Sequence, residues 1–114
     1  MLDCIFCKIA NKQIDSDIVF EDEDFVVFKD INPVADIHLL IIPRIHVESL
    51  MEIDRLDASK IKNMFIIINK MADEFGISSK GFRVVTNIGE SACQSVRHLH
   101  FHIIGGRKFV WPPG

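Results

Sequence analysis

Arg97-His98-Leu99-His100-Phe101-His102-Ile103 is the stretch around which the chain is organised, because three of the five histidines stand there at alternate positions. Alternate side chains of a β-strand point to opposite faces of the sheet. The pattern therefore predicts a strand from Val96 to Ile104 that buries Leu99, Phe101 and Ile103. Imidazole titrates near neutral pH and contributes little apolar burial, so three rings on one face indicate a functional surface.

Two chemistries suit a row of imidazoles. Neutral histidine is a common zinc ligand, and alternate spacing brings neighbouring rings within reach of one ion. Alternatively, one ring is a nucleophile whose neighbours orient it or move protons. The residues just upstream include Asn87, Gly89, Gln94 and Ser95, short donors that suit a phosphoryl group. The same composition is also typical of an ordinary hairpin loop.

These residues resemble the histidine triad (HIT) family of nucleotide hydrolases. The triad followed by an apolar pair spans His98 to Ile104, and Gly105-Gly106-Arg107 with Trp111-Pro112-Pro113-Gly114 resembles the ending of the Hint branch, the purine nucleoside phosphoramidases. The resemblance extends from the Cys4-x-x-Cys7 motif to Gly114. It implies the HIT fold, a homodimer, and no catalytic cofactor.

The activity that the resemblance implies is hydrolysis of nucleoside 5′-phosphoramidates or acyl nucleotides, with a purine base, through a nucleotidyl-histidine intermediate. His100 would be the nucleophile, and His102 and the carbonyl groups near it would fix the tautomer of His100. The expected catalytic residues are His100, His102, His98, His38 and Ser95. A nucleotide-binding regulatory module with negligible turnover, a dinucleotide polyphosphate hydrolase and a triad that holds a catalytic metal remain alternatives.

The resemblance also implies a nucleotide site. Asp30 would bind the ribose hydroxyls, while Phe28 and Ile31 would sandwich the base. The expected nucleotide-binding residues are Ile5, Phe6, Phe28, Asp30, Ile31, Asn87, Cys93, Gln94, Ser95, His100, His102 and Trp111. Cys93 departs from the family, which usually has glycine there, and a positive φ at this position would strain the cysteine.

The two cysteines near the N-terminus form a Cys-x-x-Cys motif, which is typical of a metal half-site or a redox pair. Two unligated thiols that pack as small apolar groups are the plainer alternative. The family resemblance implies a structural zinc held by Cys4, Cys7, His46 and His98. In that arrangement His98 would not be free for acid–base chemistry, because its lone pair would be on the metal.

The remaining pattern predicts an α+β fold with a five-stranded antiparallel sheet, a short N-terminal helix and one long helix. The expected strands are Asp17–Glu21, Phe25–Lys29, Ile37–Pro43, Phe82–Thr86 and Val96–Ile104, and the short helical turn is Ile5–Ile9. Either Asp54 or Asp57 would cap the long helix, and Gly76 would end it. That helix is apolar nearly all round at residues 65–68, which predicts a second subunit; a thick core with one exposed isoleucine is the alternative.

Composition narrows the class of protein. A chain of 114 residues with 48% hydrophobic and 25% charged residues is expected to form one domain over residues 1–114. A net charge of −3 argues against a non-specific nucleic-acid binder, which needs a basic surface. The first residues do not read as a signal peptide, and no apolar run is long enough for a membrane span. With three cysteines, an odd number, we expect a cytoplasmic protein without a disulfide framework.

Overall fold

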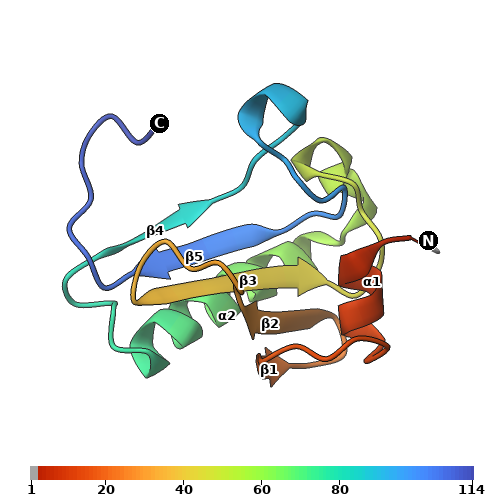
Figure 1. The fold of residues 1–114 in the computed structure, drawn as a ribbon. Helices are drawn as coiled ribbons and strands as arrows, with labels where there is room; N and C mark the ends of the chain where they lie inside the picture. Colours follow the sequence, from red (N-terminus) through yellow and green to blue (C-terminus); the bar gives the residue numbers. More distant parts are fainter. Residues whose placement is uncertain (1–2) are drawn as a thin grey trace.

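The computed structural model describes residues 3–114 and has an α+β fold with one five-stranded antiparallel sheet (Figure 1), as the sequence predicts. In chain order its elements are α1 (Ile5–Ala10), β1 (Ile18–Glu21), β2 (Phe25–Lys29), β3 (Ile37–Pro43), the 3₁₀ helix η1 (Leu50–Arg55), α2 (Ala58–Glu74), β4 (Phe82–Val85), the 3₁₀ helix η2 (Glu90–Ala92) and β5 (Phe101–Gly105). The strand order is β1-β2-β3-β5-β4, so the last strand lies between β3 and β4.

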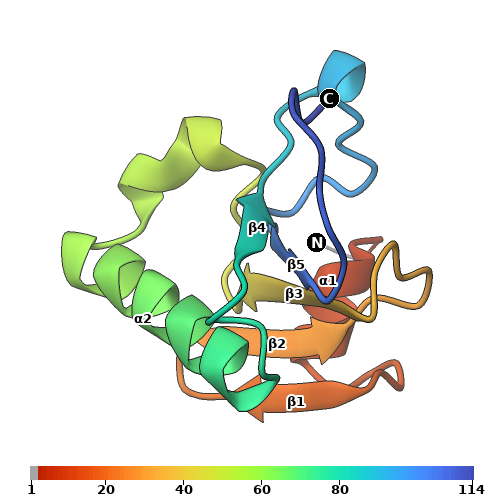
Figure 2. The same cartoon turned by 90° about the vertical axis from the view of Figure 1, so that its left-hand side faces the viewer.

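The two faces of the sheet are covered by different helices, as Figure 2 shows. Apolar residues of α2, among them Met64 and Ile68, pack with Leu39, Phe101 and Ile103 in the larger cluster of buried side chains. On the opposite face, α1 packs in a smaller cluster of buried residues: Phe6, Ile9, Ala10, Val26, Phe28, Leu40 and Ile42. His102 pairs with Leu40 across the β3–β5 ladder, which places the histidine on the α1 face.

The last strand is shorter than the sequence predicts. It begins at Phe101 rather than Val96, because pairing with β3 stops at the pair Ile41–Phe101 and pairing with β4 stops at the pair Val85–His102. Upstream of Phe101 the chain is held by single contacts instead, such as the Leu99 amide donating to the Val47 carbonyl oxygen. The alternation of side chains nevertheless continues: Leu99 is buried in the α2 cluster, while His98 and His100 are buried on the other side.

Most other boundaries agree with the sequence prediction. The observed β2 and β3 have the predicted limits, while β1 and β4 are each one residue shorter. Asp57 is the N-cap residue of α2, although its side chain makes no capping hydrogen bond. The helix ends before Gly76, whose φ of +73° is a conformation that glycine adopts without strain. Neither 3₁₀ helix was predicted, and Asp54 lies within η1.

The broad apolar surface of α2 is only partly covered. Ile67 and Ile68 are buried under the sheet, whereas Phe65 is 44% exposed and Ile66 is 53% exposed. A second subunit over these two residues therefore remains a prediction. Within residues 3–114, no helix combines the length and the apolar character that crossing a bilayer requires.

Candidate active site and metal centre

A cavity of about 390 Å³ lies on the α1 face of the sheet. Phe6 forms its aromatic wall, with ring-centroid distances of 5.5 Å to Phe28 and 5.0 Å to His100, both edge to face. Eight residues that sequence analysis assigned to nucleotide binding line the cavity: Ile5, Phe6, Phe28, Asp30, Ile31, Ser95, His100 and His102. These eight residues supply apolar surfaces, one carboxylate, one hydroxyl and two imidazoles, and Asp15, Ser16 and Lys29 also line the cavity.

Hydrogen bonds assign the tautomers of two histidines. The backbone N–H of Val34 donates to Nδ1 of His38 over 3.2 Å, so the proton of this ring is on Nε2. That Nε2–H donates to Nδ1 of His102 over 2.8 Å. His102 consequently carries its own proton on Nε2, as a donor. The carboxylate of Asp30 lies 3.4 Å from the same His38 nitrogen.

His100 is oriented by a backbone carbonyl. Its Nδ1–H donates to the carbonyl oxygen of His98 over 2.7 Å, which leaves the lone pair of a neutral ring on Nε2. The centroid of this ring lies 5.2 Å from that of His102, with the planes inclined by 65°. A ring that lines the cavity with an unprotonated Nε2 has the form required of a nucleophile.

Burial keeps these rings neutral. Burial, together with the neighbouring His100 and His38 and against an opposing effect of Asp30, lowers the pKa of His102 to about 4. Burial likewise lowers the pKa of His100 and that of His38. At pH 7 the rings are therefore unprotonated, and the lone pair of His100 is available without a base to remove a proton.

Four residues of the expected nucleotide site lie outside the cavity lining: Asn87, Cys93, Gln94 and Trp111. Trp111 is 83% exposed, beyond the end of β5. Cys93 is exposed with φ +66°, the left-handed conformation that the sequence analysis identified as a source of strain. The usual glycine would adopt this conformation freely.

The side chain of Gln94 is engaged within the protein. Both hydrogens of its Nε2 donate to carbonyl oxygens, at 2.7 Å to Glu48 and 3.1 Å to Val96. Its Oε1 accepts the backbone N–H of Gly89 over 2.9 Å. In this geometry Gln94 ties the loop before β5 to the segment after β3, and it has no amide hydrogen left to donate to a phosphate.

A second cluster joins the N-terminal cysteines to two histidines. Nδ1 of His98 lies 3.2 Å from Sγ of Cys4 and 3.4 Å from Sγ of Cys7, and Nδ1 of His46 lies 3.4 Å from Sγ of Cys7. The four ligand atoms are all within 4.8 Å of one another. Nε2–H of His98 donates to the Pro43 carbonyl oxygen over 2.8 Å, which leaves the lone pair of Nδ1 directed at the sulfurs.

This donor set fits zinc. Zn–S bonds of about 2.3 Å and Zn–N bonds of about 2.0–2.1 Å put sulfur and nitrogen at two corners of a tetrahedron about 3.5 Å apart. The observed separations of 3.2–3.4 Å need little adjustment. Burial, together with the adjacent Cys4, raises the pKa of Cys7 to about 11, so a cation is needed to favour the thiolate. A Cys₂His₂ set is closed, and both nitrogens of His98 are then occupied.

Asp30, His38 and His102 form a second group whose ligand atoms are close enough for a metal. Here the facing nitrogens of the two histidines are already joined by the 2.8 Å hydrogen bond. A metal would have to replace that bond and reverse the tautomers described above. The triad itself is divided, because His98 faces the cysteines while His100 and His102 line the cavity.

Carbonyl groups near the triad were expected to fix the tautomer of His100, and the His98 carbonyl oxygen accepts its Nδ1–H. Sequence reasoning missed the backbone groups of Val34 and Pro43, which set the tautomers of His38 and His98, because backbone groups carry no residue-type signal. It also missed a second cavity, of about 410 Å³, lined by residues that include Glu48 and Arg97. One residue of the sequence could have pointed to this cavity: Arg97, a charged residue directly before the first histidine of the triad.

Comparison with known proteins identifies relatives over nearly the whole chain. Residues 3–109 match the family model described as "Scavenger mRNA decapping enzyme C-term binding". A "14 kDa zinc-binding protein" of Zea mays is 41% identical over 112 residues, covering 96% of this chain and 87% of that protein. A HIT family hydrolase from Legionella pneumophila is 41% identical, with a TM-score of 0.94 over 98% of this chain and 100% of that chain.

A histidine triad protein from Clostridium difficile is 44% identical, with a TM-score of 0.90 over 96% of each chain. These matches, with the fold and the histidine cluster described above, define the class of the protein. The chain belongs to the HIT family, and it has the fold of HIT family hydrolases.

Proposed function

We propose that this protein hydrolyses nucleoside 5′-phosphoramidates or the related acyl nucleotides, with His100 as the nucleophile. The observation that carries the proposal is the hydrogen bond from Nδ1 of His100 to the His98 carbonyl oxygen. It leaves a neutral ring with a free Nε2 lone pair beside an apolar cavity. Covalent catalysis of this kind divides one difficult displacement into two easier ones.

In the first step Nε2 of His100 attacks phosphorus, the P–N bond breaks, and the departing nitrogen takes a proton from water. In the second step water attacks phosphorus and gives a proton to the hydroxide left by the first step, the P–Nε2 bond breaks, and His100 recovers its lone pair as the nucleoside monophosphate leaves. With its pKa at about 4, His102 acts as a neutral hydrogen-bond donor to a phosphate oxygen. The hydroxyl of Ser95 donates to the phosphate or to the leaving group.

The cavity supports a purine nucleotide as the substrate. Phe6 and Phe28, packed edge to face, offer an aromatic wall for the base, and Ile5 and Ile31 extend the apolar surface at the rim. The Asp30 carboxylate is a suitable acceptor for ribose hydroxyls. In the Hint-branch hypothesis Trp111, which is exposed within one chain, reaches the pocket of a second subunit.

We further propose that one structural zinc binds Cys4, Cys7, His46 and His98. Zinc bound there would have a structural role and not a catalytic one. It would cross-link α1 to the segment after β3 and to the loop before β5. The printed name of the maize relative supports this assignment. A cytoplasmic location is part of the same proposal, because a reducing compartment keeps thiols available as ligands.

The direct test is a single-turnover reaction with adenosine 5′-phosphoramidate, quenched with denaturant at neutral-to-alkaline pH because the P–N bond is acid-labile, followed by mapping of the nucleotidylated peptide. Label is expected on His100, and His100→Ala should lose both label and turnover. His100→Gly with added imidazole should regain part of the rate. Activity of His100→Ala within tenfold of wild type, about 1.4 kcal/mol in the barrier, would end the assignment. Faster cleavage of a diadenosine polyphosphate would favour the dinucleotide hydrolase alternative.

A further inference from the structure

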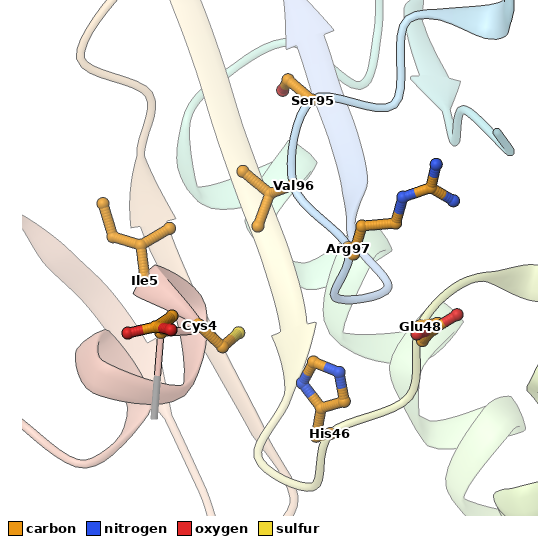
Figure 3. A pocket seen from close by; sticks show the side chains of 8 residues that line it. Cys4, Ile5, His46, Glu48, Ser95, Val96 and Arg97 are labelled. Carbon is orange, nitrogen blue, oxygen red and sulfur yellow. The ribbon is translucent and has the colours of Figure 1, made fainter. Parts of the chain in front are cut away.

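A second cavity, of about 410 Å³, adjoins the nucleotide cavity. The two share three lining residues, Ile5, Ser95 and Val96. Figure 3 shows that Cys4 and Ile5 approach this cavity from α1, His46 and Glu48 from the segment after β3, and Ser95 to Arg97 from the loop before β5. A substrate group that extends past Ser95 would therefore enter this cavity and not bulk solvent.

Arg97 is the unusual group in this lining. Four arginines of the chain, Arg44, Arg55, Arg83 and Arg107, each donate to a carbonyl or carboxylate oxygen of the protein. Among residues 3–114, no hydrogen bond or ion pair engages the guanidinium of Arg97. A guanidinium presents five donors in a planar fork that matches a carboxylate in two parallel hydrogen bonds.

The chain keeps the backbone of Arg97 close to that of Ser95. The two are two residues apart, and two residues span at most about 7 Å from Cα to Cα. Ser95 lines the nucleotide cavity together with His100, whereas Arg97 lines only the second cavity. A leaving amine that passes Ser95 thus enters the cavity that Arg97 lines, and the length of the amine decides whether its carboxylate reaches the guanidinium.

We infer that the second cavity receives the leaving group, and that Arg97 selects leaving amines that carry a carboxylate. This inference rests on the proposed phosphoramidate hydrolysis. Asp3 and Glu48 line the same cavity, so its lining has no net positive charge. A general electrostatic attraction of anions to the cavity therefore does not account for the selection. The selection comes from pairing at Arg97, and the carboxylate of Glu48 weakens it by repulsion.

The test compares adenosine 5′-phosphoramidates made from glycine or 4-aminobutanoate with those made from the corresponding amides. The readout is the ratio of kcat/KM for acid over amide, which cancels effects common to both substrates. In the wild type we expect a ratio of at least about ten for one chain length, as for a site built to pair with the group. Arg97→Gln should reduce the ratio to about one, Arg97→Lys should retain part of it, and Glu48→Gln should increase it.

Lys80→Gln is the matched control, since it removes one positive charge at an exposed position away from both cavities, and its ratio should equal that of the wild type. Melting temperature and zinc content establish that each variant is folded. A wild-type ratio near one, or a ratio that Arg97→Gln leaves unchanged, overturns the inference while the phosphoramidase proposal stands. Failure to hydrolyse any phosphoramidate, the unsubstituted one included, overturns both.

Discussion

Nε2 of His38 lies 2.8 Å from Nδ1 of His102, and the backbone N–H of Val34 determines which of the two nitrogens carries the proton. His38 comes from β3 and His102 from β5, and the β3–β5 ladder brings them to the same face. The hydrogen bond presents His102 to the cavity as a donor. In the proposed mechanism this donor stabilises a phosphate oxygen, so His38 acts through His102 as a positioning residue.

His38→Phe should therefore lower kcat by about tenfold or more, the equivalent of one lost hydrogen bond worth about 1.4 kcal/mol. The KM for the nucleotide should change less, because the apolar wall of the cavity is intact. Steady-state kinetics with adenosine 5′-phosphoramidate give both values. His38→Gln retains an N–H donor and should recover part of the rate. If His38→Phe keeps kcat within twofold of wild type, the positioning role is wrong.

Stability should fall on acidification between pH 6.5 and pH 4. Burial lowers the pKa of His102 to about 4, whereas an unfolded chain has the ordinary value of about 6.5. In this window the unfolded state binds a proton that the folded state does not, so the free energy of unfolding declines as the pH drops. One ring contributes at most about 1.4 kcal/mol per pH unit. Above pH 6.5 this contribution is fully present.

Urea unfolding at pH 7, 6 and 5 measures this dependence, and His102→Asn is the informative variant because it removes one titrating ring. Its stability should vary less with pH than that of the wild type. The depressed pKa values of His38 and His100 act in the same direction, so a residual slope is expected. Equal slopes for the variant and the wild type would contradict the assignment of a neutral, buried His102.

Cys93→Gly should stabilise the protein by about 0.5–1 kcal/mol. Cys93 has φ +66°, which costs a residue with a Cβ about 1–2 kcal/mol, and glycine avoids this cost while losing some entropy on folding. Cys93→Ser keeps the strain and should melt like the wild type, whereas the β-branched Cys93→Val should melt lower. Thermal unfolding of the three variants tests the order. A lower melting temperature for Cys93→Gly than for the wild type would show that the backbone of Cys93 is not strained.

The sequence predicts this fold well where side-chain periodicity and chain pairing agree. In β2 and β3 the apolar runs coincide with strands that have partners along their length. At residues 96–100 the alternation persists but the ladder does not, because pairing with β3 stops at Ile41–Phe101 and pairing with β4 stops at Val85–His102. Periodicity reports which way a side chain points, and it carries no information on whether a neighbouring strand is present.

In the active site, too, the sequence pattern predicts some features and not others. Alternation predicts that His98, His100 and His102 share a side of the chain, and they do. It does not predict that His98 turns toward the cysteines while the other two line a cavity. Ring orientation depends on the carbonyl oxygens of Pro43 and His98, which any residue type would provide. The engagement of Gln94 by two carbonyl oxygens escaped prediction for the same reason.

We predict a dimer through the exposed side of α2. Phe65 and Ile66 leave an apolar surface that a second subunit would cover. Sedimentation at micromolar concentration should give about twice the 13.0 kDa chain mass. Ile66→Lys should shift the protein toward monomer, because a charge would be buried in the interface. Gln13→Lys, which places the same charge at an exposed position just after α1, on the opposite face of the sheet, should not. A compact wild-type monomer would refute the prediction.

The last prediction concerns zinc at Cys4, Cys7, His46 and His98. Protein purified without chelator should contain one zinc per chain, and Cys4→Ser or Cys7→Ser should lose it. Cys93→Ser is the matched control, since Cys93 is exposed and outside the cluster, and it should retain the metal. A ligand that binds only the folded state stabilises it by about 2.7 kcal/mol at one hundred times its Kd. Chelation should therefore lower the melting temperature of the wild type and have no effect on Cys4→Ser.

Phosphoramidase activity should survive chelation in the fraction that stays folded, because His98 holds its Nε2 proton on Pro43 and His100 is oriented by a backbone carbonyl, not by the metal. Activity that disappears while the chain remains folded would instead indicate a catalytic metal. If no zinc is found, and Cys4→Ser and Cys7→Ser melt like the wild type, the two thiols are packing groups. Nδ1 of His98 would then accept from a cysteine thiol instead of binding a metal, and the rate of His98→Asn would show whether this ring takes part in proton transfer beside His100.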